Sequence, residues 1–251
     1  MNKPEQSLNR YQQIIERIFF WYYTAGDQEV AFSREDMVRA AQELRVNLPK
    51  NLGDIPYSFR YRSTLPQSIQ AKAPQGKDWI IRPAGRAQYR FVTVTESLII
   101  PSKNIVEIRI PDATPGIVAM YAQGDEQALL ARLRYNRLLD IFTSITCYSL
   151  QNHLRTVVPA MGQVETDEIY VGIDTEGRHY IFPIQAKSKK DKIGIVQIEQ
   201  DFALCTDKFP ALTCRPIAAQ FIEQNLIALI AFEEGENGIS IALEKHYRLT
   251  P

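Results

Sequence analysis

The sequence predicts a mixed α/β protein with a helical N-terminal part and a C-terminal part built around a β-hairpin. Residues 8–23 carry apolar side chains at helical spacing. Residues 169–173 and 179–184 are β-rich runs that flank the turn-forming residues 174–177. With 251 residues, 45% hydrophobic and 23% charged, the chain suits one large globular domain or two small ones.

Three charged side chains and one neutral amide lie where the hairpin strands should end. Asp167 and Glu168 precede the first strand, and Gln185 and Lys187 close the second. An antiparallel hairpin with its turn near Gly177 brings all four together, and the count from that turn places Glu168 near Gln185 across the ladder.

These side chains suit phosphodiester hydrolysis. Carboxylate and amide oxygens hold Mg²⁺ while phosphate oxygens complete its shell. A lysine two residues along the strand from Gln185, on the same face, orients or activates the attacking water.

The acidic residue, the hairpin and the run Gln185-Ala186-Lys187 together resemble the PD-(D/E)xK nuclease superfamily, in the Gln-x-Lys variant of Mrr-like restriction nucleases. The resemblance implies a restriction-endonuclease-like α/β/α core with a mixed sheet over residues 126–245. The alternative is a surface hairpin whose polar ends are merely solvated.

Each residue of the hairpin motif receives a role. Glu168 is the first choice for the acidic metal ligand, because the hairpin count places it opposite Gln185 and because it directly precedes the apolar run. Asp167 is the second choice, and the two cannot share the role because adjacent strand residues point to opposite faces. Glu165 replaces or supplements them if the strand begins earlier. Gln185 offers a neutral oxygen ligand, and Lys187 polarises the water or stabilises the charge that develops on phosphorus.

Segments on either side of the hairpin bear on the resemblance to the PD-(D/E)xK superfamily. Residues 148–155 read as a helix, and Gln151 lies where nucleases of this superfamily often carry a helical Glu, which implies an outer supporting ligand. After the hairpin, Lys189 and Lys190 belong to a basic loop that suits a phosphate backbone, although a solvated charge run is the simpler reading. Residues 193–208 then have the pattern of a helix, and a helix is also expected before the hairpin, from residue 126 to about residue 142.

The N-terminal part resembles a winged helix. Helices are expected at residues 8–23, 34–44 and, interrupted by Pro56, 51–62, before two strands around residues 83–85. In that module the third helix enters the major groove and the wing touches the backbone or minor groove. The resemblance assigns the DNA contacts to four arginines: Arg60, Arg62, Arg82 and Arg86. A helical protein-interaction domain is the alternative.

The charge distribution favours a polyanion partner. Residues 1–95 hold 14 Lys and Arg against 9 Asp and Glu, a net charge of +5, although the whole chain is neutral. The expected organisation is a DNA-binding domain at 1–95, a connector at 96–125 and a nuclease domain at 126–251.

Composition also indicates the state of the cysteines and the compartment in which the protein is expected. The 3 cysteines are odd in number and far apart, which supports neither a disulfide framework nor a zinc site and suggests core positions. No stretch has the length of a membrane span and the N-terminus has no signal-peptide pattern, so a cytoplasmic prokaryotic protein is expected.

The leading hypothesis is a Mg²⁺-dependent endonuclease of double-stranded DNA, of restriction type, acting as a homodimer on twofold-symmetric sites. A second hypothesis is a DNA-binding regulator that keeps a nuclease-like core without catalysis. A third is a structure-specific repair or junction nuclease.

Overall fold

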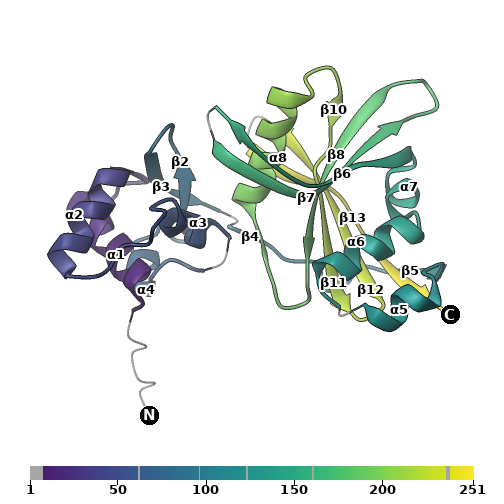
Figure 1. Cartoon of the computed structure of the whole chain (residues 1–251), viewed down its shortest axis with the longest axis horizontal. Helices are drawn as coiled ribbons and strands as arrows, with labels where there is room; N and C mark the ends of the chain where they lie inside the picture. Colours follow the sequence, from purple (N-terminus) through teal and green to yellow (C-terminus); the bar gives the residue numbers. More distant parts are fainter. Residues whose placement is uncertain (1–7, 62, 96, 123, 160, 236–237) are drawn as a thin grey trace, which may run out of the picture. The chain divides into compact units, whose positions relative to one another are not determined.

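The computed structural model describes residues 8–61, 63–95, 97–122, 124–159, 161–235 and 238–251. It is a mixed α/β protein, as the sequence predicts, and it divides into two compact units. The first unit comprises residues up to Ser97 together with Pro159–Gly162, and the second comprises Leu98–Val158 and Gln163–Pro251. Figure 1 follows the chain through both units.

The first unit combines four helices with a small antiparallel sheet in the described residues. Its elements are α1 (Arg10–Tyr22), β1 (Glu29–Ser33), α2 (Arg34–Leu44), α3 (Asp54–Tyr61), α4 (Gln67–Gln70), β2 (Asp78–Pro83) and β3 (Gln88–Val94). The strand order is β1-β3-β2. Phe19 of α1 packs edge-on against Trp79 and Phe91 of the sheet, which ties the helices to the strands.

Local sequence explains where these helices begin. Ser33 caps α2 in a reciprocal arrangement with Asp36, as its position before an acidic first turn predicts. Helix α3 runs through Pro56 without interruption because that proline lies in the first turn, where a missing N–H costs no helical hydrogen bond. Arg62 lies outside the described residues.

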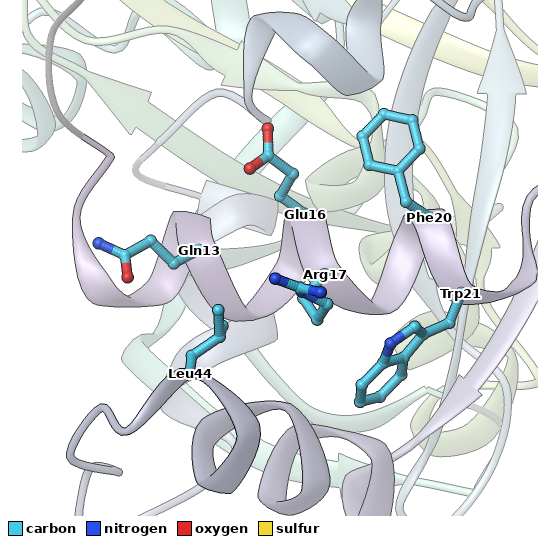
Figure 2. A pocket seen from close by; sticks show the side chains of 6 residues that line it. All are labelled: Gln13, Glu16, Arg17, Phe20, Trp21 and Leu44. Atoms are coloured by element: carbon cyan, nitrogen blue, oxygen red, sulfur yellow. The ribbon is translucent and has the colours of Figure 1, made fainter.

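A hollow of about 450 Å³ lies on the outer side of α1 (Figure 2). Five side chains of α1 and one of α2 line it: Gln13, Glu16, Arg17, Phe20, Trp21 and Leu44. Arg17 pairs with Glu43 at 2.9 Å beside it, and the guanidinium of Arg39 lies 4.4 Å from the Trp21 ring centroid. Groups of the same unit therefore already contact Arg17 and Trp21 in the lining of the hollow.

The second unit is organised around one large mixed sheet. The strands of that sheet, in chain order, are β5 (Glu107–Pro111), β6 (Thr146–Val158), β7 (Gly162–Ile173), β8 (His179–Lys187), β10 (Thr213–Cys214), β11 (Ile217–Glu223), β12 (Leu226–Gly235) and β13 (Gly238–Thr250). The short strands β4 (Leu98–Ile99) and β9 (Ile193–Gly194) pair with each other in a separate sheet. The helices of the unit are α5 (Gly116–Tyr121), α6 (Glu126–Tyr135), α7 (Leu138–Thr143) and α8 (Ile195–Lys208). The order in the large sheet is β5-β13-β12-β11-β8-β7-β6, with β10 beside β8.

Helices cover both faces of the large sheet (Figure 1). Along β8, Phe182, Ile184 and Ala186 join the core formed with α6 and α7. Residues between them point to the opposite face, since side chains alternate along a strand. On that face, Ile198 of α8 packs in a second core with residues of β11 and β12. Strand β11 runs parallel to β8, and α8 lies between them in the chain.

Two helix predictions in this unit are wrong. Residues 148–155 form part of strand β6, because pairing with β7 in the sheet overrides a helical pattern with little apolar periodicity. The helix expected from residue 126 to 142 breaks into α6 and α7 at Arg137, whose φ of 47° is left-handed. In the described part of the chain no helix has both the length and the apolar character needed to cross a membrane.

Candidate active site

The hairpin β7–β8 brings Asp167, Gln185 and Lys187 to the sheet face that α8 covers. Asp167 Oδ2 accepts a hydrogen bond of 2.8 Å from the backbone N–H of Ala186 and lies 3.9 Å from Lys187 Nζ. Gln185 and Lys187 are two residues apart on β8, so their side chains leave the strand on the same side. Three polar side chains of the predicted motif therefore meet.

Glu126 is a member of this group that sequence reasoning missed as a site residue. It is the first residue of α6, and its Oε1 lies 2.7 Å from Lys187 Nζ. The preceding Asp125 caps the helix by accepting a hydrogen bond from the N–H of Ala128, which fixes Glu126 as the first residue of α6. The acidic pair at the helix start was visible in the sequence, but only the fold shows that it reaches Lys187.

The pKa of the Asp167 carboxyl is raised above its ordinary value. Burial is the main cause, and the carboxylates of Glu126 and Glu165 add to it. The ammonium of Lys187 and the hydrogen bond from Ala186 act in the opposite direction. A further cation at this position would relieve the repulsion among the carboxylates.

Glu168, the first choice for the acidic ligand, lies on the other face of the sheet. Its partner across the ladder is Ile184, one residue before the predicted partner Gln185, so Glu168 shares the face of Ile184 and not that of Gln185. The side chain is 0% exposed and accepts from Arg134 Nε at 2.9 Å and from the Ser149 hydroxyl. Asp167, the second choice, takes the position beside Lys187.

Gln151 does not come to the site from a helix. It is an exposed residue of β6, two positions from Ser149 and therefore on the face where Ser149 meets Glu168. The prediction of an outer helical ligand is wrong for this reason. Glu165 lies on the Asp167 side of β7, but its carboxylate pairs with Arg155 at 2.7 Å and His153 at 3.1 Å.

Helix α8 holds the amide of Gln185 in a buried polar cluster. Gln185 Nε2 donates to both carboxyl oxygens of Asp201 at 3.0 Å and to the Glu165 carbonyl at 3.3 Å. Gln197 Nε2 donates to Gln185 Oε1 at 3.2 Å. All three side chains are at least nine-tenths buried, so the amide orientation is fixed by the helix. Asp201 and Gln197 carried no sequence signal beyond the helical pattern.

The basic loop after β8 forms a closed turn. The Ser188 hydroxyl bonds the Asp191 carboxylate, and Gln220 Nε2 of β11 donates to the Asp191 carbonyl at 2.7 Å. Lys189 and Lys190 at the tip are exposed. Gln220 is the ladder partner of Lys187, so the turn is anchored beside the candidate site.

The arginines predicted to contact DNA lie on three elements of the first unit. Arg60 is on α3, Arg82 is on β2 and both are partly buried, whereas Arg86 is exposed in the turn between β2 and β3. That turn has left-handed backbone at Gly85 and Ala87, which closes it tightly around Arg86.

The donor set near Lys187 fits Mg²⁺ better than a softer metal. The described residues contain no group of three or more His, Cys, Asp and Glu side chains placed to hold a metal. Two carboxylates, of Asp167 and Glu126, and the carbonyl of Ala186 all lie around the Lys187 ammonium. Mg²⁺ is commonly bound by one or two carboxylates, with water and substrate phosphate completing its octahedral shell.

Comparison with protein-family models, with curated proteins and with solved structures gives no match to any of them.

Proposed function

We propose that this protein is a Mg²⁺-dependent, sequence-specific endonuclease of double-stranded DNA, of restriction type. The observation that carries the proposal is the position of Lys187, whose Nζ lies 2.7 Å from Glu126 Oε1 at the start of α6 and 3.9 Å from Asp167 Oδ2 on β7. Carboxylates around a lysine ammonium bind a hard cation and a phosphate together.

Element order supports the same proposal. Helices α6 and α7, the meander β6–β7–β8, helix α8 and the parallel strand β11 follow one another along the chain. This order resembles the α/β/α core of restriction-endonuclease-like proteins. In the first unit, helices α1, α2 and α3, strand β1 and the closing hairpin β2–β3 with Arg86 at its turn resemble a winged helix, which would select the DNA site.

Lys187 has a defined part in the proposed reaction. Water attacks phosphorus, one P–O bond forms and another breaks, and negative charge builds up on the phosphoryl oxygens. Lys187 Nζ carries three N–H groups, and two of them are used by Glu126 and the Ala186 carbonyl. The third can donate to a phosphate oxygen. Mg²⁺, held by Asp167 and Glu126, would supply positive charge and an ordered water.

Gln185 serves this reaction by positioning. Its amide bonds Asp201 and Gln197, which fixes the β8 backbone that presents Ala186 and Lys187. Lys189 and Lys190, in the anchored turn, would neutralise backbone phosphates next to the scissile bond.

The bonding of Gln185 also favours a second candidate, a DNA-binding regulator without catalysis. Gln185 Oε1 accepts from Gln197 and is therefore engaged within the protein, which leaves the carboxylates of Asp167 and Glu126 beside Lys187 as metal ligands in the described residues. The regulator would bind the same DNA and leave it intact.

Digestion of unmethylated phage DNA tests the proposal. The purified protein is incubated with the DNA and either Mg²⁺ or EDTA, and the products are separated on a gel. Discrete bands that need Mg²⁺ support a sequence-specific endonuclease. Intact DNA in every reaction, with a salt-sensitive mobility shift, would establish the regulator instead.

A further inference from the structure

Strand β6 forms one edge of the large sheet, and its first nine residues lack the side chains that usually prevent edge-to-edge pairing. It is the terminal strand in the described sheet. From Thr146 to Leu154 its sequence contains no Asp, Glu, Lys, Arg or Pro. Natural edge strands are normally blocked by such residues, because their unpaired backbone groups otherwise recruit another strand.

The opposite edge of the same sheet is protected. Strand β5 carries Glu107 and Arg109 and ends at Pro111. Glu107 is held by Arg248 of the neighbouring strand β13. The contrast shows that this sheet blocks one of its edges with charge and leaves the other neutral.

The exposed part of β6 has apolar side chains and outward backbone groups. Tyr148 is 58% exposed and Leu150 is 52% exposed, and both point to the same face. The N–H of Cys147 donates to Asp140 of α7 at 3.0 Å, so it points away from β7. The backbone N–H and C=O groups of successive residues point to alternate sides of a strand, and therefore those of Ser149 and Gln151 also point away from β7. At His153 a φ of 52° ends the regular stretch.

We propose that β6 pairs antiparallel with β6 of a second copy of this chain, about a twofold axis at Leu150. Ser149 and Gln151 then exchange backbone hydrogen bonds with Gln151 and Ser149 of the second copy. The two Leu150 side chains face each other, and Tyr148 faces Asn152. One continuous sheet runs through both copies.

The chemistry of the edge selects a second copy as the partner. Twofold antiparallel pairing places the residue on the axis opposite its own counterpart and keeps its neighbours close to theirs, so an ionised residue near the axis would lie beside its own like charge. The neutral run from Thr146 to Leu154 avoids that repulsion. Each outward backbone N–H of one copy also meets a backbone C=O of the other, because outward N–H and C=O groups occur at the same alternate residues in both copies. The proposal does not depend on nuclease activity.

The mass of the 251-residue chain in solution tests the proposal. Sedimentation equilibrium of the wild type should give twice the chain mass of 28.7 kDa. Leu150→Lys places two ammonium groups face to face and should give the single-chain mass. Ile108→Lys, a matched control at a position 40% exposed on β5, should remain a dimer. A wild type that stays at 28.7 kDa, or a Leu150→Lys variant that stays dimeric, would overturn the proposal, as would a monomeric Ile108→Lys variant.

A crosslink tests the position of the axis. Directly opposed residues of this kind have Cα atoms about 4.5 Å apart, and a disulfide spans about 4.4–6.8 Å between Cα atoms. Leu150→Cys, oxidised with copper-phenanthroline, should run as a covalent dimer on a non-reducing gel. The wild type and Ile108→Cys should run as single chains. Absence of the Leu150→Cys crosslink, or an equal crosslink in Ile108→Cys, would rule out this axis.

Discussion

The buried contact between Gln185 and Asp201 sets the geometry of the candidate site at the scale of single residues. Asp201 is 1% exposed and accepts from Gln185 Nε2 at 3.0 Å with both oxygens. Asp201→Leu removes both acceptors, which should lower the free energy of unfolding by about 1–3 kcal/mol. Asp201→Asn keeps a carbonyl acceptor and should lose less. Urea unfolding measures both, and equal stability of the Leu variant and the wild type would contradict the contact's role.

Glu126 is expected to lower the Mg²⁺ concentration that cleavage requires. Glu126→Gln removes one of the two carboxylates around Lys187 and should raise the Mg²⁺ concentration needed for half-maximal cleavage. A Mg²⁺ titration of cleavage rate measures the change. Glu176→Gln, an exposed substitution in the hairpin turn, is the control. An unchanged titration in Glu126→Gln would remove this residue from the site.

At the scale of elements, the sequence predicts the hairpin and helix α8 well, and misses the strand register and β6. Residues 169–173 and 179–184 pair antiparallel as predicted, and the helix expected at 193–208 spans Ile195–Lys208. Register follows the turn centre at Glu176, and a shift of one residue reverses the face of every side chain. That shift explains why Asp167 and not Glu168 meets Lys187.

The hairpin turn should make stability depend on pH. Burial favours the neutral acid, but hydrogen bonds from Arg178, Tyr180 and the N–H of Glu176 outweigh it and lower the pKa of Asp174 to about 2. The carboxylate therefore stabilises the fold above about pH 4. This contribution is lost as the pH falls through about 2.

Asp174→Ala should accordingly be less stable than the wild type at neutral pH, and the difference should narrow as the pH falls from about 4 to about 2. Thermal unfolding of both proteins across this range measures it. A difference that does not change with pH would contradict the role given to the carboxylate.

At the scale of the whole molecule, composition and periodicity predict the mixed α/β class, while long-range contacts remain outside their reach. Glu126 and Lys187 are 61 residues apart and meet only because α6 packs beside β8. Asp201 similarly reaches Gln185 from a helix whose pattern predicts only its apolar face. Such contacts depend on tertiary packing, which local periodicity does not encode.

DNA binding by the first unit should show the salt dependence of a phosphate contact. Arg86→Ala, at the exposed turn between β2 and β3, should weaken binding to all duplex sequences. It should also lower the slope of log affinity against log salt by about 1. Mobility shifts at several salt concentrations measure both effects. Arg17→Ala, whose arginine pairs with Glu43, is the control, and an equal loss there would contradict a specific contact by Arg86.

Cleavage and binding measured together on the same phage DNA test the central claim most directly. The wild type and Lys187→Ala are compared with Lys208→Ala, which changes an exposed lysine at the end of α8. The wild type and Lys208→Ala should cut with Mg²⁺ and not with EDTA, while Lys187→Ala should bind DNA with unchanged affinity and leave it intact. Cleavage by Lys187→Ala at the wild-type rate, or no cleavage by the wild type, would contradict the assigned active site.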